Sequence, residues 1–353
     1  MGWRAFLLCK GYYMTTSKPF KTYNQQLKIL RSRNISIDIG NEGSKVKRIL
    51  SRENYYSIIN GYKSIFIDKI QTKASGEDYF ISGTTFFHIY EVYCFDRALR
   101  GILLAALLQA EKGLKTKVSY RFSEKYQQPF SHLNINNFSK TDMQLVTKLI
   151  SKLSSTTQNN TNAKTKDGEF YHYLTKHQDL PLWVLSNRMT FGEILFLFTA
   201  LHPTLKETIL KDFIDDFKYE YNEQIDCPLS SLLPIFDNML HALVSFRNIC
   251  AHEDRLYNHV VKKSKRTNGK SKTTIISIDG TILNKSGFIN ANLLGVIIIL
   301  KFFITSKAYS RLIKDVVASI TMLSKSIPPH ALNTVTREMG LSSNWRQQLK
   351  NLK

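Results

Sequence analysis

The sequence has 353 residues, and its 49 Lys and Arg outnumber its 28 Asp and Glu, which gives a formal net charge of +21. With 43% hydrophobic residues the chain can bury one large or two modest cores, which excludes global disorder. The charge favours a polyanionic partner, nucleic acid ahead of an anionic membrane surface or acidic proteins, although an AT-rich genome also raises the lysine count.

The four cysteines, Cys9, Cys94, Cys227 and Cys250, stand alone in the sequence. Their spacing matches neither a zinc site nor a disulfide framework and is typical of a reducing compartment. We therefore expect a cytoplasmic protein with no metal or other cofactor. The longest apolar run, at 293–304, is interrupted by Lys301 and is shorter than the ~20 residues of a membrane span. We expect it to be a buried helix and expect no membrane partner.

The apolar periodicity predicts a mostly α-helical chain. In chain order, we expect helices over 21–34, 44–67 and 85–126, the last with no proline in its middle. A polar loop is expected over 154–169, and a helix then begins within 180–201. Thr190 and Glu193 have the spacing of a capping box at its start.

A further helix is expected over 234–259, followed by an insertion over 260–285. This insertion begins with the basic stretch "VVKKSKRTNGKSK", expected to be a loop, and continues into a small β-hairpin that turns at Asp279-Gly280. Helices resume over 290–326 until "IPP" at 327–329 ends them. No repeat or sharp boundary is visible. We divide the chain into a poorly ordered extension over 1–17 (Met14 is an alternative start), an N-terminal helical region over 18–84, a helical domain over 85–326 and a C-terminal tail over 327–353.

The 234–259 helix carries the stretch "SFRNICAHEDRLYNH" over 245–259. On a helical wheel of ~100° per residue its apolar arc contains Met239, Leu243, Phe246, Ile249, Cys250 and Leu256. The opposite face aligns Asn248, His252, Arg255 and His259. Arg247 lies about 100° from Asn248, at the edge of the apolar arc, so its side chain has to reach round to meet His252.

A solvated helix face is the simplest interpretation of this stripe. Such faces usually carry Lys and Glu four residues apart, whereas this one carries directional hydrogen-bonding groups. Histidine accepts and donates protons near neutral pH, and arginine offers a fixed fork to phosphate. Metal-independent RNA cleavage needs these two parts, a base for the 2′-hydroxyl and a cation for the charge that develops on the phosphate.

The spacing Arg247-Asn248-x-x-x-His252 resembles the Arg-(four to six residues)-His motif of HEPN ribonucleases. The longer string "FRNICAHEDRLYN" is more specific and is similar to the signature of the Abi-like family of phage abortive-infection proteins, of the AbiD/AbiF type. Other segments resemble this family in the same order, from about Lys18 to Arg346: "KPFKTYNQQLKIL", "INGYKSIF", "YCFDRALRGILLAALLQAEKGLKTKVSY", "LPLWVLSNRMTFGEI" and "MGLSSNWR". The segments 154–169 and 260–285 depart from it.

The resemblance implies an all-α HEPN bundle, with additional N-terminal helices and a small β-hairpin insertion, that forms a homodimer with two copies of the motif in one cleft. It implies metal-independent RNA cleavage that leaves a 2′,3′-cyclic phosphate. His252 matches the general acid/base, Arg247 the phosphate-binding cation and Asn248 the polar residue that orients the site. Arg255 and Tyr257 belong to the family string and are either structural or in contact with RNA. A small non-coding RNA that restrains the protein, as in a toxin-antitoxin pair, is a family-level expectation.

Several other residues have both a structural and a functional interpretation. Asp96 and Arg100 have the spacing of an intrahelical ion pair, but Arg97 or Arg100 is also a candidate RNA contact. The basic run after the motif is either a solvated loop or an arm that grips phosphate; its members are Lys262, Lys263, Lys265, Arg266, Lys270 and Lys272. The tyrosines Tyr55, Tyr56 and Tyr62 are expected to be packed rather than to stack on bases, and His88 and His241 to be core or capping residues.

Two functions therefore remain open from the sequence. The first, which we favour, is an anti-phage endoribonuclease that uses Arg247 and His252 across a dimer. The second is a non-catalytic RNA-binding protein that holds a structured non-coding RNA. Both explain the charge and the motif, and they differ in whether His252 is needed for cleavage. A membrane-surface protein is disfavoured because no long basic amphipathic helix with an exposed aromatic face is evident.

Overall fold

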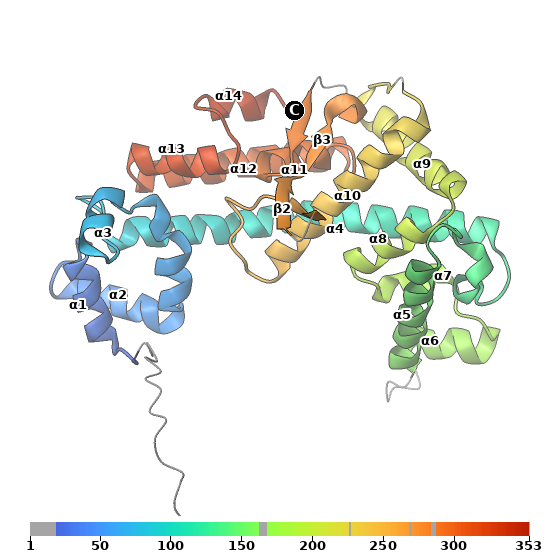
Figure 1. The fold of residues 1–353 in the computed structure, drawn as a ribbon, viewed down its shortest axis with the longest axis horizontal. Helices are drawn as coiled ribbons and strands as arrows, with labels where there is room; N and C mark the ends of the chain where they lie inside the picture. Colours follow the sequence, from blue (N-terminus) through green and yellow to red (C-terminus); the bar gives the residue numbers. More distant parts are fainter. Residues whose placement is uncertain (1–18, 162–167, 226, 268–269, 284–286, 353) are drawn as a thin grey trace, which may run out of the picture. The chain divides into compact units, whose positions relative to one another are not determined.

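The computed structural model describes residues 19–161, 168–225, 227–267, 270–283 and 287–352; of residues 160–161, 264–267, 270–275 and 281–282 it describes only the backbone. The described chain is mostly helical with a small β element, which confirms the predicted fold class (Figure 1). It forms two compact units, Met1–Tyr90 and Glu91–Lys353, called here the N-terminal and C-terminal units. They divide inside helix α4 (Phe86–Lys125), and the extension expected over 1–17 lies outside the described residues.

The N-terminal unit contains three short α-helices, α1 (Tyr23–Ser32), α2 (Asn41–Arg52) and α3 (Lys69–Ser75). The single helix expected over 44–67 is wrong, because α2 ends at Arg52 and is followed by a π-turn (Tyr56–Asn60) and a 3-10 turn (Lys63–Ile65). Glu53 is extended, and the Asn54 side chain accepts the N–H of Tyr56. An asparagine that bonds the backbone locally in this way competes with helix continuation.

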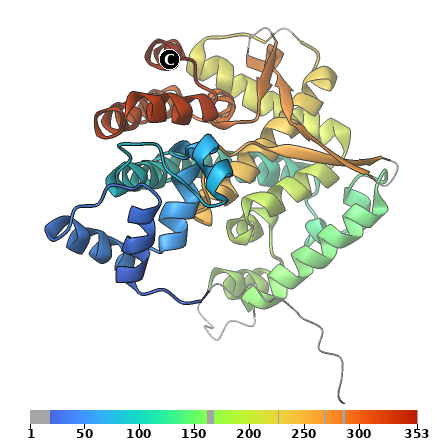
Figure 2. The ribbon, with the colours of Figure 1, turned by 60° about the vertical axis from the view of Figure 1, so that its left-hand side comes forward.

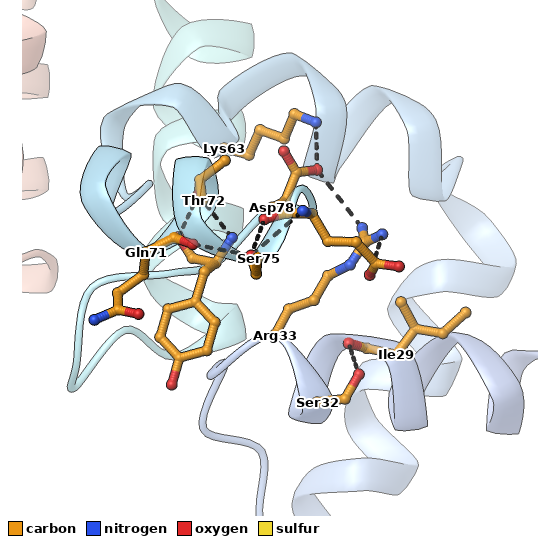
Figure 3. A network of polar contacts seen from close by, with 10 residues as sticks. Ile29, Ser32, Arg33, Lys63, Gln71, Thr72, Ser75 and Asp78 are labelled. Carbon is orange, nitrogen blue, oxygen red and sulfur yellow. Dashed lines mark hydrogen bonds and ion pairs between the residues drawn. The ribbon is translucent and has the colours of Figure 1, made fainter.

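A network of polar contacts connects distant segments of the N-terminal unit (Figure 3). The carboxylate of Asp78 contacts Lys63 and, at 3.6 Å, Arg33, so residues far apart in the sequence are held together. Of the tyrosines, Tyr62 is buried as expected, whereas Tyr56 is 70% exposed. His88 accepts the N–H of Thr85 near the start of α4, which is the expected capping role.

The C-terminal unit contains most of α4 and ten further α-helices in its described part: α5 (Met143–Thr161), α6 (Glu169–His172), α7 (Leu182–Leu185), α8 (Phe191–Ala200), α9 (Pro203–Tyr221), α10 (Leu229–Ala251), α11 (Leu293–Leu300), α12 (Ser306–Ser326), α13 (Pro329–Glu338) and α14 (Trp345–Lys350). The Thr190–Glu193 capping box at the start of α8 is confirmed. The segment expected to be a tail, 327–353, instead forms α13 and α14, which contact α12 and bury Val335 and Leu349.

Helix α5 shows that the polar loop expected over 154–169 is wrong over its first half. The helix continues to Thr161 because Val146, Leu149 and Leu153 give it a buried face. Its hydroxyl groups bond to carbonyls within the helix, as Thr157 does to Leu153, so the polar composition does not end it. Residues 162–167 lie outside the described residues.

The β element differs from the prediction in which segments form strands and in which strands pair. Strands β1 (Lys262–Thr267) and β2 (Lys270–Ile275) form an antiparallel pair from the stretch expected to be a basic loop (Figure 2). Asp279-Gly280 is not a hairpin turn: β3 (Ser277–Asp279) pairs with β4 (Phe288–Asn290), and a 3-10 turn (Gly280–Leu283) follows β3 directly. Strand-forming threonines thus pair even where lysines interrupt them.

Helix α10 is the centre of the C-terminal unit. It begins at Leu229, five residues before the expected start, and keeps Pro234 inside its first turns. Its buried face, which includes Phe236, Met239 and Leu243, packs against α8, α9 and α11. In the described part of the chain it is the one helix long and apolar enough to cross a membrane, with 39% of the tested window buried. We interpret it as a core helix because its apolar face already has protein partners. Most of the apolar run at 293–304 is buried too, as expected, but its helix, α11, ends at Leu300.

Candidate active site

The motif helix ends at Ala251, eight residues earlier than the sequence predicts. His252 is the C-terminal cap of α10, and Glu253 takes a left-handed conformation with φ 58°. The N–H of Asp254 bonds to the carbonyl of Ile249 at 3.1 Å, the six-to-one bond of a Schellman turn. The chain therefore leaves the helix axis directly after His252.

This turn corrects the predicted polar stripe. Asn248 and His252 are four residues apart on the exposed side of α10, as predicted. Arg255 and His259 lie beyond the helix, so their expected place on the same face is wrong. The Nε2 of His259 lies 3.0 Å from the hydroxyl of Ser245, and its ring packs edge-on against Phe246. Burial lowers the pKa of His259, opposed by the charge of Asp254.

A buried ion pair on α4 holds the segment that follows His252. Asp96 and Arg100 contact each other at 2.8 Å, and both are buried. The Asp96 carboxylate also accepts the backbone N–H groups of Leu256 and Tyr257, at 3.0 and 2.7 Å. Arg100 donates to the carbonyl of Asp254 at 3.3 Å. The predicted ion pair is confirmed, and its role is to fix the turn that carries His252.

Arg247 points away from the exposed face and toward α4, which α10 crosses (Figure 1). Its Nε donates to Glu111 at 3.2 Å, and the other oxygen of that carboxylate contacts Lys115 at 2.8 Å. Glu111 is 5% exposed. Sequence reasoning missed Glu111 and Lys115; the signal for them was a carboxylate and an ammonium one helical turn apart on a helix otherwise rich in Ala and Leu. Together the three side chains form a cation-rich cluster around one buried carboxylate.

The remaining predicted RNA contacts fall into two groups. Arg100 and Tyr257 are buried, at 5% and 0% exposure, which favours their structural interpretation over a contact with RNA. Arg97 and Arg255 are exposed, each over a tyrosine ring, at 5.2 Å from Tyr93 and 6.0 Å from Tyr257.

The basic run lies on the β1–β2 hairpin. Lys262 and Lys263 are exposed at the start of β1, and the Lys263 ammonium contacts the Asn238 side chain on α10. The backbone of Lys265 and Arg266 belongs to β1, but their side chains lie outside the described residues. The run is therefore strand and not loop, and it begins beside α10.

Chemically, this end of α10 offers an exposed imidazole and amide on one face and an anchored guanidinium on the side that faces α4. In the described ranges, no group of three or more His, Cys, Asp or Glu side chains could hold a metal ion. The Cys250 thiol, two residues before His252, is buried, and burial raises its pKa to about 12, so it is no nucleophile at neutral pH. The groups on offer are those of proton transfer and phosphate binding.

Comparison with family models matches residues 48–258 to the Abi-like protein family. This match covers more than half of the chain and includes the Asp96–Arg100 pair, Glu111 and the whole motif from Arg247 to Tyr257. Comparisons with curated proteins and with solved structures gave no significant match.

Proposed function

The chain belongs to the Abi-like protein family, and from this premise we propose that it is a metal-independent endoribonuclease of the HEPN type. Membership of the family indicates a role in abortive infection, the defence of bacteria against phage. The assignment to the AbiD/AbiF type, the RNA substrate, the dimer and control by a small non-coding RNA are parts of the proposal.

The observation that carries the proposal is the different anchoring of Arg247 and His252. Arg247 is held through its Nε by buried Glu111, and a guanidinium has five N–H donors, so the terminal nitrogens remain able to bind phosphate. His252 is exposed at a helix end that buried Asp96 fixes through the following backbone. A fixed cation and an accessible imidazole are what phosphate-ester cleavage needs.

The reaction uses the RNA's own 2′-hydroxyl as nucleophile. His252 removes the proton from that hydroxyl, and the oxygen attacks the adjacent phosphorus while Arg247 binds a non-bridging oxygen. The bond from phosphorus to the 5′-oxygen breaks, and that oxygen takes a proton from a second histidine acting as acid. The products are a 2′,3′-cyclic phosphate and a 5′-hydroxyl end. Asn248, on the same face as His252, orients the substrate.

A second copy of the chain supplies the second histidine. Within one chain, Arg247 and His252 are five residues apart, which places them about 140° apart around the helix and about 7.5 Å apart along it. Two copies of the exposed Asn248–His252 face, related by a two-fold axis, bring two imidazoles to one phosphate. RNA contacts from Arg97, Arg255 and Lys263 extend from this centre.

The proposal is tested by RNA cleavage in EDTA with the wild type, Arg247→Ala and His252→Ala. Matched controls are Arg311→Ala, an exposed arginine on α12, and His330→Ala, an exposed histidine on α13. We expect cleavage by the wild type and both controls, cyclic phosphate ends, and a loss of at least 100-fold in each motif variant.

Each contrary result has a defined meaning. Cleavage that persists in both motif variants would place the activity elsewhere. A dimeric wild type that cleaves no RNA but purifies with one small RNA would favour the non-catalytic RNA-binding alternative. Light scattering on the same samples measures the dimer independently of activity.

A further inference from the structure

A groove runs along α4 from the Glu111 cluster to α7. Its volume is about 820 Å³, and Glu111, the partner of Arg247, lines it. Lining residues on α4 extend to Glu124, thirteen positions beyond Glu111, which is about 20 Å along a helix. The opposite wall comes from Trp183 and the turn after α7, with Ser186 and Asn187. The groove thus lies entirely within the C-terminal unit and begins at the candidate active site.

Two large aromatic side chains on this groove are exposed. Trp183 is 52% and Tyr120 61% exposed, and Lys112 lies exposed on the same wall as Tyr120. Exposed aromatic rings beside a lysine, in a chain of net charge +21, are the elements of a surface on which bases stack while cations follow the backbone. The two carboxylates of the groove do not oppose this, because each is paired: Glu111 with Lys115 and Arg247, and Glu124 with Arg121.

Buried polar atoms without partners give a second, independent sign of a ligand. The Ser119 hydroxyl, on the groove wall, is buried and has no hydrogen-bond partner among the described residues. The groove shares Ser123, Gln127 and Trp183 with a smaller cavity of about 150 Å³, where the Nε2 of His132 is likewise buried and unpartnered within the described chain. His132 is 1% exposed. Unsatisfied buried groups are rare in folded proteins and indicate a missing partner such as water or a ligand.

We propose that this groove binds single-stranded RNA, with bases stacked on Trp183 and Tyr120 and phosphates beside Lys112 and Lys115. The inference rests on the proposed function and deepens it, because it assigns single-stranded RNA as the substrate. A strand bound in the groove would reach Arg247 at the end where Glu111 lies. Single strands are favoured over duplexes because paired bases hide the ring faces that stack. RNA is favoured over a protein partner because lysines and hydrogen-bonding side chains, including Ser119, Ser186 and Asn187, line the groove beside its aromatic rings.

The test measures binding without cleavage. In the His252→Ala background, the affinity for a fluorescein-labelled 12-nucleotide RNA without secondary structure is compared with that for its duplex by fluorescence anisotropy. The variants are Trp183→Ala, Tyr120→Ala and the conservative Trp183→Phe. The matched control is Tyr219→Ala, an 87% exposed tyrosine on α9 outside the groove. We expect about 10-fold weaker single-strand binding in each alanine variant, nearly full binding with Phe, and no change in the control.

The outcomes separate this inference from the proposed function. If Trp183→Ala and Tyr120→Ala both leave single-strand affinity unchanged, the proposal that RNA binds in this groove is wrong, even if cleavage depends on Arg247 and His252. Trp183-dependent binding by a wild type that never cleaves RNA supports the groove while the proposed nuclease fails. If Trp183→Ala instead changes the oligomeric state in light scattering and leaves RNA affinity intact, the groove is a protein interface and the inference is wrong.

Discussion

The carboxylate of Asp96 on α4 accepts the backbone N–H of Tyr257 at 2.7 Å, which joins two positions 161 residues apart in the sequence. Asp96 is fully buried, and its ion pair with Arg100 provides the compensating charge. Through this contact the middle of α4 fixes the turn that follows His252. The candidate active site therefore depends on a core ion pair that itself touches no substrate.

Replacing Asp96 is expected to be strongly destabilising. Asp96→Ala leaves Arg100 buried without a counter-charge and frees two backbone N–H groups, so we expect a loss of about 3–5 kcal/mol in the free energy of unfolding. Urea unfolding followed by circular dichroism measures it. Asp216→Ala is the control, because Asp216 pairs with Lys117 at 2.6 Å but is 64% exposed, and it should cost no more than about 1 kcal/mol. Equal losses in the two variants would contradict the role of burial.

Glu111 is expected to act on activity through Arg247. Glu111→Gln removes the charge that holds the guanidinium, so Arg247 should lose its fixed position and single-turnover RNA cleavage should fall by about 10- to 100-fold. The control is Glu124→Gln, which changes a carboxylate of the same groove that pairs with Arg121 instead. Because Glu111→Gln also alters folding stability, both variants are assayed well below their melting temperatures. A rate for Glu111→Gln that equals that of the control would show that Glu111 does not position Arg247.

The sequence predicted the helical class, the long α4 and the capping box of α8, because each depends on local pattern. The errors arose where one local signal outweighed tertiary contacts. The polar run after Ser154 was predicted as a loop, but the apolar positions just before it keep that part of α5 helical. Asp279-Gly280 has the composition of a hairpin turn, yet the strand that pairs with β3 lies at Phe288–Asn290.

At the site, the sequence identified the residues of the motif but not their arrangement. A helical wheel assumes that the helix is continuous. The local sequence gives no sign that Glu253 takes a left-handed conformation and ends α10, because residues with a Cβ atom rarely adopt it. The contacts of Arg247 with Glu111, and of Asp96 with the backbone of Tyr257, join distant parts of the chain. Single-sequence periodicity carries no information about such pairs.

His132 is expected to make stability depend on pH. Burial lowers its pKa from 6.5 to about 4, opposed by the charge of Asp179, so between these values the unfolded chain binds a proton that the folded chain does not. The contribution of His132 to the free energy of unfolding is fully present above pH 6.5. It is lost as the pH falls toward 4, by about 3 kcal/mol in total. His132→Leu should remove this component.

The measurement compares urea unfolding of the wild type and His132→Leu at pH 7.5 and 4.5, because carboxylates that titrate in the same range cancel in the difference. His330→Leu, at an exposed position on α13, controls for the removal of a histidine. If the wild type and His132→Leu lose the same stability on acidification, His132 does not titrate as its burial requires.

The two lysines at the start of β1 are expected to differ in their contribution to RNA binding. Successive side chains of a strand point to opposite faces, and Lys263 is the one that reaches Asn238 on α10. If RNA follows the exposed side of α10 from His252, Lys263 contacts phosphate and Lys262 does not. Each phosphate contact with a single strand contributes about 0.7 to the slope of log K against log salt concentration. Lys263→Gln should therefore reduce that slope by about 0.7, and Lys262→Gln should leave it unchanged.

Anisotropy titrations over a series of salt concentrations, in the His252→Ala background, measure both slopes. Equal reductions in the two variants would indicate a general electrostatic effect of the hairpin and would contradict a path along α10.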